Sequence, residues 1–398
     1  MSNQKKQWGA IIVMIALFAM IAFVTNLCTP MATIIKNQGP ISNVLAQIGN
    51  YGNFVAYLVM GIPAGMLIAK FGYKKTALIG LAVGAAGILI QWVSGLLDVE
   101  QNLGLVFTVY LIGAFIAGLC MCILNCVVNP MLNLLGGGGN SGNQLIQIGG
   151  VFNSSAAVAC YILMGALISD ATKAKIADAT PALMIALAIF VVAFIVILFT
   201  KIEEPEQAPV DVNLIKGALK YRHFVLGIVA IFLYMGIEVG VPTYVNMYLV
   251  NTPSLGISAA TAGLIVAVYW FMMLIGRFVG ASIGSKVSSR AMLTTVSIAT
   301  LLLVSFGMFA PTDITVSVPG IDWANLKLIW ANVPVGIFAF LLVGLCTSVM
   351  WGGIFNMAVE GLGKYTAAAS GIFMTMVFGC AVMLFIQAQV AEMTDYMT

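Results

Sequence analysis

Long apolar segments, separated by short polar runs, dominate this chain of 398 residues. Eleven segments reach about 20 residues, the length at which a helix crosses the hydrocarbon core of a bilayer. They lie at residues 8–35, 47–69, 76–97, 104–135, 144–168, 181–200, 224–250, 257–284, 290–310, 329–360 and 366–391. We predict a helix for each, because an open strand in lipid would leave its amides unpaired, and no segment has the alternation of a membrane β-barrel.

Composition places most of the chain in lipid. Hydrophobic residues make up 61% and charged residues 8%, whereas soluble domains carry about 25% charged residues. The mean hydropathy is +1.06. The first segment is too long for the apolar core of a signal peptide, so we expect it to remain as the first helix. The seven cysteines lack the spacing of a metal site or a secreted disulfide framework, and we expect no metal and no cofactor.

Basic residues predict the orientation in the membrane. If the N-terminus is cytoplasmic, only Lys36, Lys173, Lys175 and Lys327 lie on the outer side. The inner segments then carry Lys5, Lys6, Lys70, Lys74, Lys75, Lys201, Lys216, Lys220, Arg222, Lys286, Arg290 and Lys364. This asymmetry follows the positive-inside rule. We therefore expect a multi-pass protein of a bacterial inner (plasma) membrane with a cytoplasmic N-terminus.

One long hydrophilic segment divides the chain into two parts. It predicts an N-terminal six-helix bundle at 1–200, a cytoplasmic linker at 201–222 and a C-terminal bundle at 223–398, in which five helices are seen. The parts resemble each other weakly, because Gly65–Lys75 follows the second segment and Gly280–Arg290 the eighth. Internal repetition is typical of transporters with a site between two bundles. Six helices in each half would require a twelfth, which is missing from this chain, and we expect truncation.

Several motifs resemble one family of transporters. They are Gly61-Ile62-Pro63-Ala64-Gly65, Lys70-Phe71-Gly72-Tyr73-Lys74, Asn129-Pro130, Phe152-Asn153, Tyr234-Met235-Gly236-Ile237-Glu238-Val239 and Ile275-Gly276-Arg277-Phe278. Together they resemble the fucose–galactose–glucose:proton symporter branch of the major facilitator superfamily. The resemblance implies the all-α major facilitator fold of two six-helix bundles, alternating access, and a conformational gate motif comprising Gly65, Lys70, Gly72, Lys74 and Lys75.

Two departures from the family pattern concern proton coupling. The proton-carrying aspartate of the first helix corresponds to Asn26 here, and the glutamate of the fourth helix corresponds to Asn125. A glutamine expected before Phe152-Asn153 is replaced by Gly150, although Gln147 lies one turn earlier. An amide retains hydrogen-bonding capacity but does not carry a proton near neutral pH. The sequence thus favours a facilitator, or a symporter driven through another residue.

Polar residues within spans are the best functional candidates, because they usually face a cavity or a partner helix. Sugar rings stack on aromatic side chains while their hydroxyls bond amides, and Trp351 occupies the position of a family tyrosine in the tenth helix. Tyr234, Tyr269 and Trp270 are secondary candidates, since membrane aromatics often only pack. The predicted substrate-binding set is Asn26, Asn125, Asn129, Gln147, Asn153, Glu238, Tyr244, Asn246, Trp351 and Asn356.

Glu238 and Arg277 are the ionisable residues that the pattern places deep within spans. We consider two interpretations: a structural ion pair, or a role for Glu238 in substrate binding or coupling. Plain interhelical hydrogen bonding is the corresponding alternative for the asparagines.

The sequence favours transport of a neutral monosaccharide, such as a hexose, fucose or an amino sugar. A carrier of sugar phosphates would need several arginines. Export of an apolar or drug-like compound is the main alternative, suggested by 23 methionines, and a non-transporting membrane sensor is a third. We find no catalytic constellation and predict that the protein is not an enzyme. We expect a monomer in the lipid bilayer that binds no nucleic acid.

Overall fold

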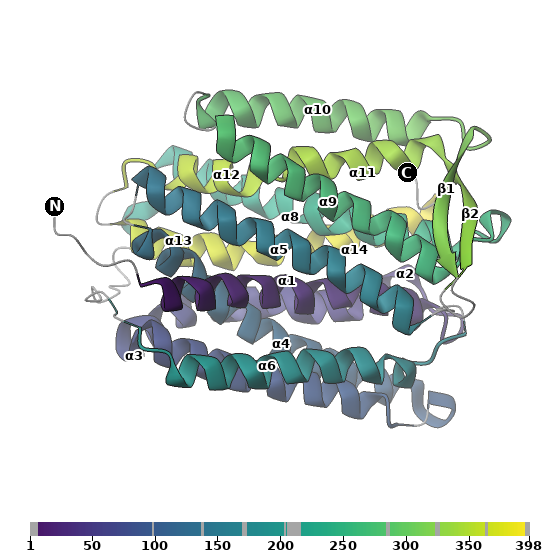
Figure 1. Cartoon of the computed structure of the whole chain (residues 1–398), viewed down its shortest axis with the longest axis horizontal. Coiled ribbons are helices and arrows are strands. Elements are labelled where there is room, and N and C mark those ends of the chain that lie inside the picture. The colour runs from purple at the N-terminus through teal and green to yellow at the C-terminus, as the bar shows by residue number, and fades with distance from the viewer. Residues whose placement is uncertain are drawn as a thin grey trace.

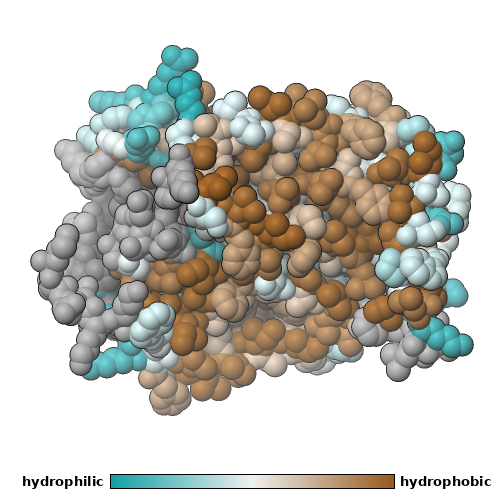
Figure 2. Space-filling model, turned by 45° about the horizontal axis from the view of Figure 1, so that its top comes forward, coloured by the Kyte–Doolittle hydropathy of each residue, from teal (hydrophilic) through white to brown (hydrophobic). Residues whose placement is uncertain are grey.

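A computed structural model describes residues 7–97, 99–136, 139–168, 173–202, 204, 216–283, 287–322, 327–362 and 365–394. Within these ranges, 11 helices are long and apolar enough to cross a membrane, which confirms the predicted number of spans. The helices run roughly parallel to one another (Figure 1). An apolar belt covers the middle of the molecule between two more hydrophilic ends (Figure 2). This belt is the surface that faces lipid.

The first half of the chain forms five long helices and two short ones. These are α1 (Trp8–Lys36), α2 (Asn43–Ala46), α3 (Ile48–Ser94), α4 (Val99–Leu135), α5 (Gly139–Leu167), η1 (Ile176–Ala179) and α6 (Thr180–Phe199). α3 contains two spans, which meet at Gly72, where φ is +78°. Glycine adopts this conformation without a Cβ clash. α1 has its two ends at opposite ends of the molecule, and we name these the Trp8 end and the Lys36 end.

The second half contains interrupted helices. Its elements are α8 (Arg222–Asn251), η2 (Pro253–Leu255), α9 (Ala259–Ile283), α10 (Ser289–Phe309), α11 (Val335–Thr347), α12 (Met350–Val359), α13 (Thr366–Thr375), η4 (Met376–Phe378) and α14 (Gly379–Met393). The tenth span is divided between α11 and α12 by a turn at Ser348 and Val349. The eleventh passes through the short 3-10 segment η4. Interrupted helices are frequent next to transporter binding sites.

A β-hairpin lies between α10 and α11 at the Lys36 end (Figure 1). Strands β1 (Thr315–Asp322) and β2 (Lys327–Pro334) pair antiparallel, with Val316 opposite Val333 and Val318 opposite Ala331. The prediction that the tenth span begins at residue 329 was therefore wrong: residues 329–334 belong to β2, and the helix starts at Val335. The apolar side chains of β2 run directly into the helix, so hydropathy alone does not separate the two elements.

The two halves pack against each other along α5 with α9, α3 with α13 and α14, and α1 with α8. In Figure 1 they lie largely on opposite sides of the molecule, with α5 and α9 next to each other where they meet. Glycines permit the close contacts. A Cβ on Gly61 would clash with Thr375 of the other half, and a Cβ on Gly165 would lie 3.0 Å from the backbone of Ala260. The predicted linker falls mainly at 203 and 205–215, outside the described residues.

Candidate functional site

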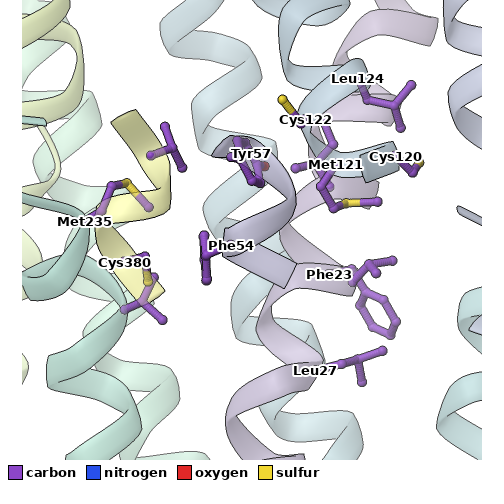
Figure 3. Close-up of a cluster of buried hydrophobic side chains, with 14 of the residues drawn as sticks. Phe23, Leu27, Phe54, Tyr57, Cys120, Met121, Cys122, Leu124, Met235 and Cys380 are labelled. Carbon is purple, nitrogen blue, oxygen red and sulfur yellow. The ribbon is translucent and has the colours of Figure 1, made fainter. Parts of the chain in front are cut away.

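Asn125 and Asn129 share one face of α4, at the centre of the first half. The Asn125 amide donates to the Tyr57 hydroxyl at 2.9 Å and to the Met121 carbonyl at 3.1 Å. Asn129 donates to the Asn125 carbonyl at 3.1 Å. Asn125 is 9% exposed, so it does not face lipid. Figure 3 shows Tyr57 on α3, close to Met121 and Cys122 of α4. Tyr57 was missed in the sequence, where it is one of many aromatics in spans.

Asn26 is also buried, in the middle of α1. Its side-chain amide donates to the Ala22 carbonyl of the same helix at 2.8 Å. The structure therefore keeps Asn26 inside the protein but does not join it to Asn125 by a hydrogen bond. Both positions carry a neutral amide within the bundle.

Arg277 of α9 crosses to α5 of the other half. Its Nη1 donates to the Gly150 carbonyl, to the Ser154 hydroxyl at 2.8 Å and to the Asn153 side-chain oxygen at 3.4 Å. Asn153 in turn donates to the Phe18 carbonyl of α1 at 2.8 Å. A Cβ on Gly150 would lie 3.3 Å from the Arg277 side chain. The missing side chain at position 150 therefore leaves the space that the guanidinium occupies.

Glu238 lies on α8, one turn after Tyr234. It is within electrostatic range of Arg277. Within the described ranges, however, the Arg277 hydrogen bonds go to α5, and no close contact joins the guanidinium to the Glu238 carboxylate. The Glu238–Arg277 ion pair and the coupling role of Glu238 remain predictions.

Trp351 lies in an aromatic cluster at the start of α12. Its ring centroid is 6.4 Å from that of Tyr234 and 5.8 Å from that of Phe373. The turn before α12 places Trp351 in this cluster. Just before that turn, the Thr347 carbonyl accepts a hydrogen bond from the Tyr234 hydroxyl at 3.2 Å. Asn356 is partly exposed on the same short helix.

Gln147 approaches this cluster from α5 of the first half. Its Nε2 lies 3.4 Å from the point where a Cβ on Gly352 would be. Gly352 directly follows Trp351 in the chain. Gln147 of the first half is therefore close to the backbone next to Trp351 of the second half.

Hydroxyl and amide groups join the halves towards the Lys36 end. The Thr29 and Thr243 hydroxyls are 2.9 Å apart, and the Thr33 hydroxyl donates to the Asn246 side-chain oxygen at 2.6 Å. Asn246 thus lies at this seam, on α8. The threonines were missed, although the spacing of Thr29 and Thr33 places them on one face of α1. A further predicted residue, Tyr244, donates to the Leu384 carbonyl at 3.1 Å within the second half.

The predicted gate motif connects α3 to the chain just after α6. The Glu204 carboxylate accepts from the amides of Tyr73 at 2.7 Å and Lys74 at 2.9 Å. Lys74 Nζ donates to the carbonyls of Leu198 at 3.0 Å and Thr200 at 2.8 Å. The negative Glu204 thus caps the N-terminal end of the second span of α3, and the positive Lys74 caps the C-terminal end of α6. Each charge is opposite to the partial charge of the helix end that it caps. Of the other motif residues, Lys70 lies over the Phe71 ring, and a Cβ on Gly65 would meet none of the surrounding described atoms within 4 Å. A gating role for the motif, including Lys75, remains a prediction.

Where the two halves meet, the contacts described above are made largely by hydroxyl and amide groups. Such groups bind a neutral polyhydroxylated molecule without requiring charge on it. No cluster of potential metal ligands occurs in the part of the chain that the structure describes. The fold and the site together define a polytopic membrane transporter.

The chain belongs to the Major Facilitator Superfamily, whose model matches residues 10–385. It is 28% identical over 399 residues to a glucose/galactose transporter of Brucella abortus, covering 98% of this chain and 90% of the relative. A putative glucose/galactose transporter of Helicobacter pylori is 25% identical over 390 residues, covering 95% and 88%. The L-fucose-proton symporter of Escherichia coli is 21% identical over 391 residues, covering 92% and 82%. The chain is thus a transporter and not an enzyme.

Solved structures confirm the fold. A crystal structure of the transporter FucP in the outward conformation matches with a TM-score of 0.69 and 20% identity, covering 96% of this chain and 92% of that chain. A nucleoside transporter, NupG, matches with a TM-score of 0.63 and 14% identity, covering 99% and 94%. The predicted major facilitator fold is therefore correct.

Proposed function

We propose that this protein moves a neutral monosaccharide across a bacterial inner membrane by alternating access, with the Trp8 end in the cytoplasm. The observation that carries the proposal is the approach of Gln147 to Gly352, the neighbour of Trp351, from the opposite half. A ring for stacking and an amide for hydroxyl groups match the chemistry of a pyranose. The relatives named for glucose, galactose and fucose support the same substrate class.

In this proposal the protein is a facilitator, which moves the sugar without coupling to protons. Asn26 and Asn125 are neutral amides held by hydrogen bonds inside the bundle, and neither takes up a proton near neutral pH. Glu238 is the titratable alternative that the experiments must test. Gly65, Lys70, Gly72, Lys74 and Lys75 are assigned to the gate because they lie at or near the junction between the two spans of α3, on the side that we place in the cytoplasm.

Counterflow in proteoliposomes tests the proposal directly. Vesicles preloaded with unlabelled glucose, galactose, fucose or glucosamine should accumulate the labelled form of a transported sugar, and protein-free vesicles should not. Trp351→Ala should lose most of this accumulation, with thermal unfolding measured to establish that the variant is folded. Absence of counterflow for the whole panel with folded protein would reject the sugar assignment.

Orientation is tested by single-cysteine labelling. A cysteine at Ser2 should react with a membrane-impermeant maleimide only after cells are opened, whereas one at Thr312, in the loop before β1, should react in intact cells. The reverse pattern would contradict a cytoplasmic N-terminus.

A further inference from the structure

Two aromatic residues face each other across the inter-half seam, on the Lys36 side of the Trp351 cluster. Tyr161 of α5 and Trp270 of α9 stack with ring centroids 6.5 Å apart and an interplanar angle of 28°. They are 0% and 5% exposed. Tyr269 packs edge-on against Trp270 at 5.3 Å. The pair therefore joins one ring from each half in the interior of the protein.

Among the described residues, the polar atoms of this pair are buried without hydrogen-bond partners. These atoms are the Tyr161 hydroxyl and the Trp270 indole nitrogen. Thr29 and Trp270 are the polar neighbours of the Tyr161 hydroxyl. A buried donor without a partner is unfavourable. Other tyrosines between the helices, including Tyr234 and Tyr244, have carbonyl partners.

A small cavity adjoins Tyr161. It has a volume of about 20 Å³ and is lined by α1, α5, α8 and α9, with Thr33, Tyr161 and Asn246 among its residues. The Thr29–Thr243 and Thr33–Asn246 hydrogen bonds close the same seam. Neutral donors and acceptors, aromatic faces and residual space therefore occur together at a joint between the halves.

We propose that Tyr161 and Trp270 form an outer sugar-binding position, which a neutral pyranose occupies when the halves separate at the Lys36 end. Separation parts the two rings, frees the threonine and asparagine groups and exposes the two unpaired donors to sugar hydroxyls. The position lies before the Trp351 cluster on the path inward. This inference rests on the proposed sugar transport and on the proposed orientation.

The test compares the two sides of the membrane. The sugar is the one that gives the strongest counterflow with the wild type. Its initial uptake rates are measured in right-side-out and in inside-out vesicles that contain Trp270→Phe or Tyr161→Phe. Each variant removes one polar group and keeps an aromatic ring. We expect the half-saturation concentration to rise about threefold to tenfold from the outer side, as for the loss of one neutral hydrogen bond. From the inner side it should change less than twofold.

Trp92→Phe is the matched control, because the Trp92 indole nitrogen is also buried without a partner but lies on α3. It should leave both half-saturation concentrations unchanged. Intrinsic fluorescence gives an independent readout: the sugar-dependent change of the wild type should shrink in Trp270→Phe and persist in Trp92→Phe.

Each contrary result is informative. If Trp270→Phe and Tyr161→Phe leave the half-saturation concentrations unchanged on both sides, the buried donors only pair with resident water. If both variants raise the half-saturation concentrations equally on the two sides, the rings belong to the inner site. Either result overturns the outer position while leaving sugar transport intact. Absence of wild-type counterflow rejects both proposals together.

Discussion

The Arg277 guanidinium donates a hydrogen bond to the Ser154 hydroxyl at 2.8 Å, across the boundary between the two halves. Because the same nitrogen also reaches the Gly150 carbonyl and Asn153, this arginine is a brace between α9 and α5. Gly150 provides the room for it. The brace ties a residue with a permanent charge to neutral acceptors rather than to a carboxylate.

Removing the brace should impair both stability and transport. We expect Arg277→Gln to destabilise the protein by about 2–3 kcal/mol, since hydrogen bonds to charged groups contribute about 1.5–3 kcal/mol each and are not additive. Arg277→Lys keeps the charge but loses the planar fork, and should give an intermediate effect. Thermal unfolding and counterflow measure these changes. A Ser154→Ala variant that is as defective as Arg277→Gln would contradict a shared role of the three acceptors.

Proton coupling is predicted to be absent. Addition of a transported sugar to cells in weakly buffered medium should leave the external pH unchanged, because Asn26 and Asn125 carry neutral amides, which do not take up a proton near neutral pH. A pH electrode records the result, with an E. coli strain expressing its L-fucose-proton symporter as the positive control. A sugar-induced pH rise that vanishes in Glu238→Gln would overturn the facilitator interpretation and assign coupling to Glu238.

The Tyr57–Asn125 bond should support the central amide. Tyr57→Phe removes the hydroxyl that accepts from Asn125 at 2.9 Å, and we expect a loss of about 1 kcal/mol in stability, as for a neutral buried hydrogen bond. Sugar binding, read as thermal stabilisation by added ligand, should weaken along with it. Tyr110→Phe, in the same bundle but away from Asn125, is the control. Equal ligand responses in the two variants would argue against a site function of Asn125.

Gly72 should be intolerant of a side chain. Its φ is +78°, and a Cβ would collide with the Glu204 carboxylate that caps the second span of α3. We expect Gly72→Ala to destabilise by about 2 kcal/mol, from backbone strain and a disturbed cap. Gly104 is exposed on α4, and a Cβ there would lie 3.8 Å from the Asn102 side chain, which is an ordinary van der Waals distance. Gly104→Ala should therefore be neutral or stabilising by up to about 1 kcal/mol. Similar unfolding temperatures for the two variants would refute this argument.

Hydropathy was sufficient to predict the number of spans, because the need to pair every backbone amide in lipid leaves little choice of structure. It did not predict the hairpin, since Ile329 and Trp330 are as apolar as the helix that follows. The break at Ser348 and Val349 also lacks a local signal, because neither residue is proline or glycine. Such features depend on packing between segments distant in sequence.

The sequence identified polar residues that make hydrogen bonds inside the protein, but it did not identify their partners. Polarity within a span identified Asn125, Asn153 and Asn246, and each makes a side-chain hydrogen bond in the structure. The partners Tyr57, Phe18 and Thr33 could not be inferred, because they come from other helices or from backbone atoms. The Arg277 contact with Gly150 is a further example, in which the decisive feature is a missing side chain.

The turn between α11 and α12 divides the tenth span into a longer arm, α11, and a shorter arm, α12. The longer arm is held near its end by the contact between the Tyr269 and Thr347 hydroxyls at 3.1 Å, and it packs against α9 and α10. The shorter arm carries Trp351. This arm packs mainly against α8. The two arms of a single span are therefore anchored to different sets of neighbouring helices.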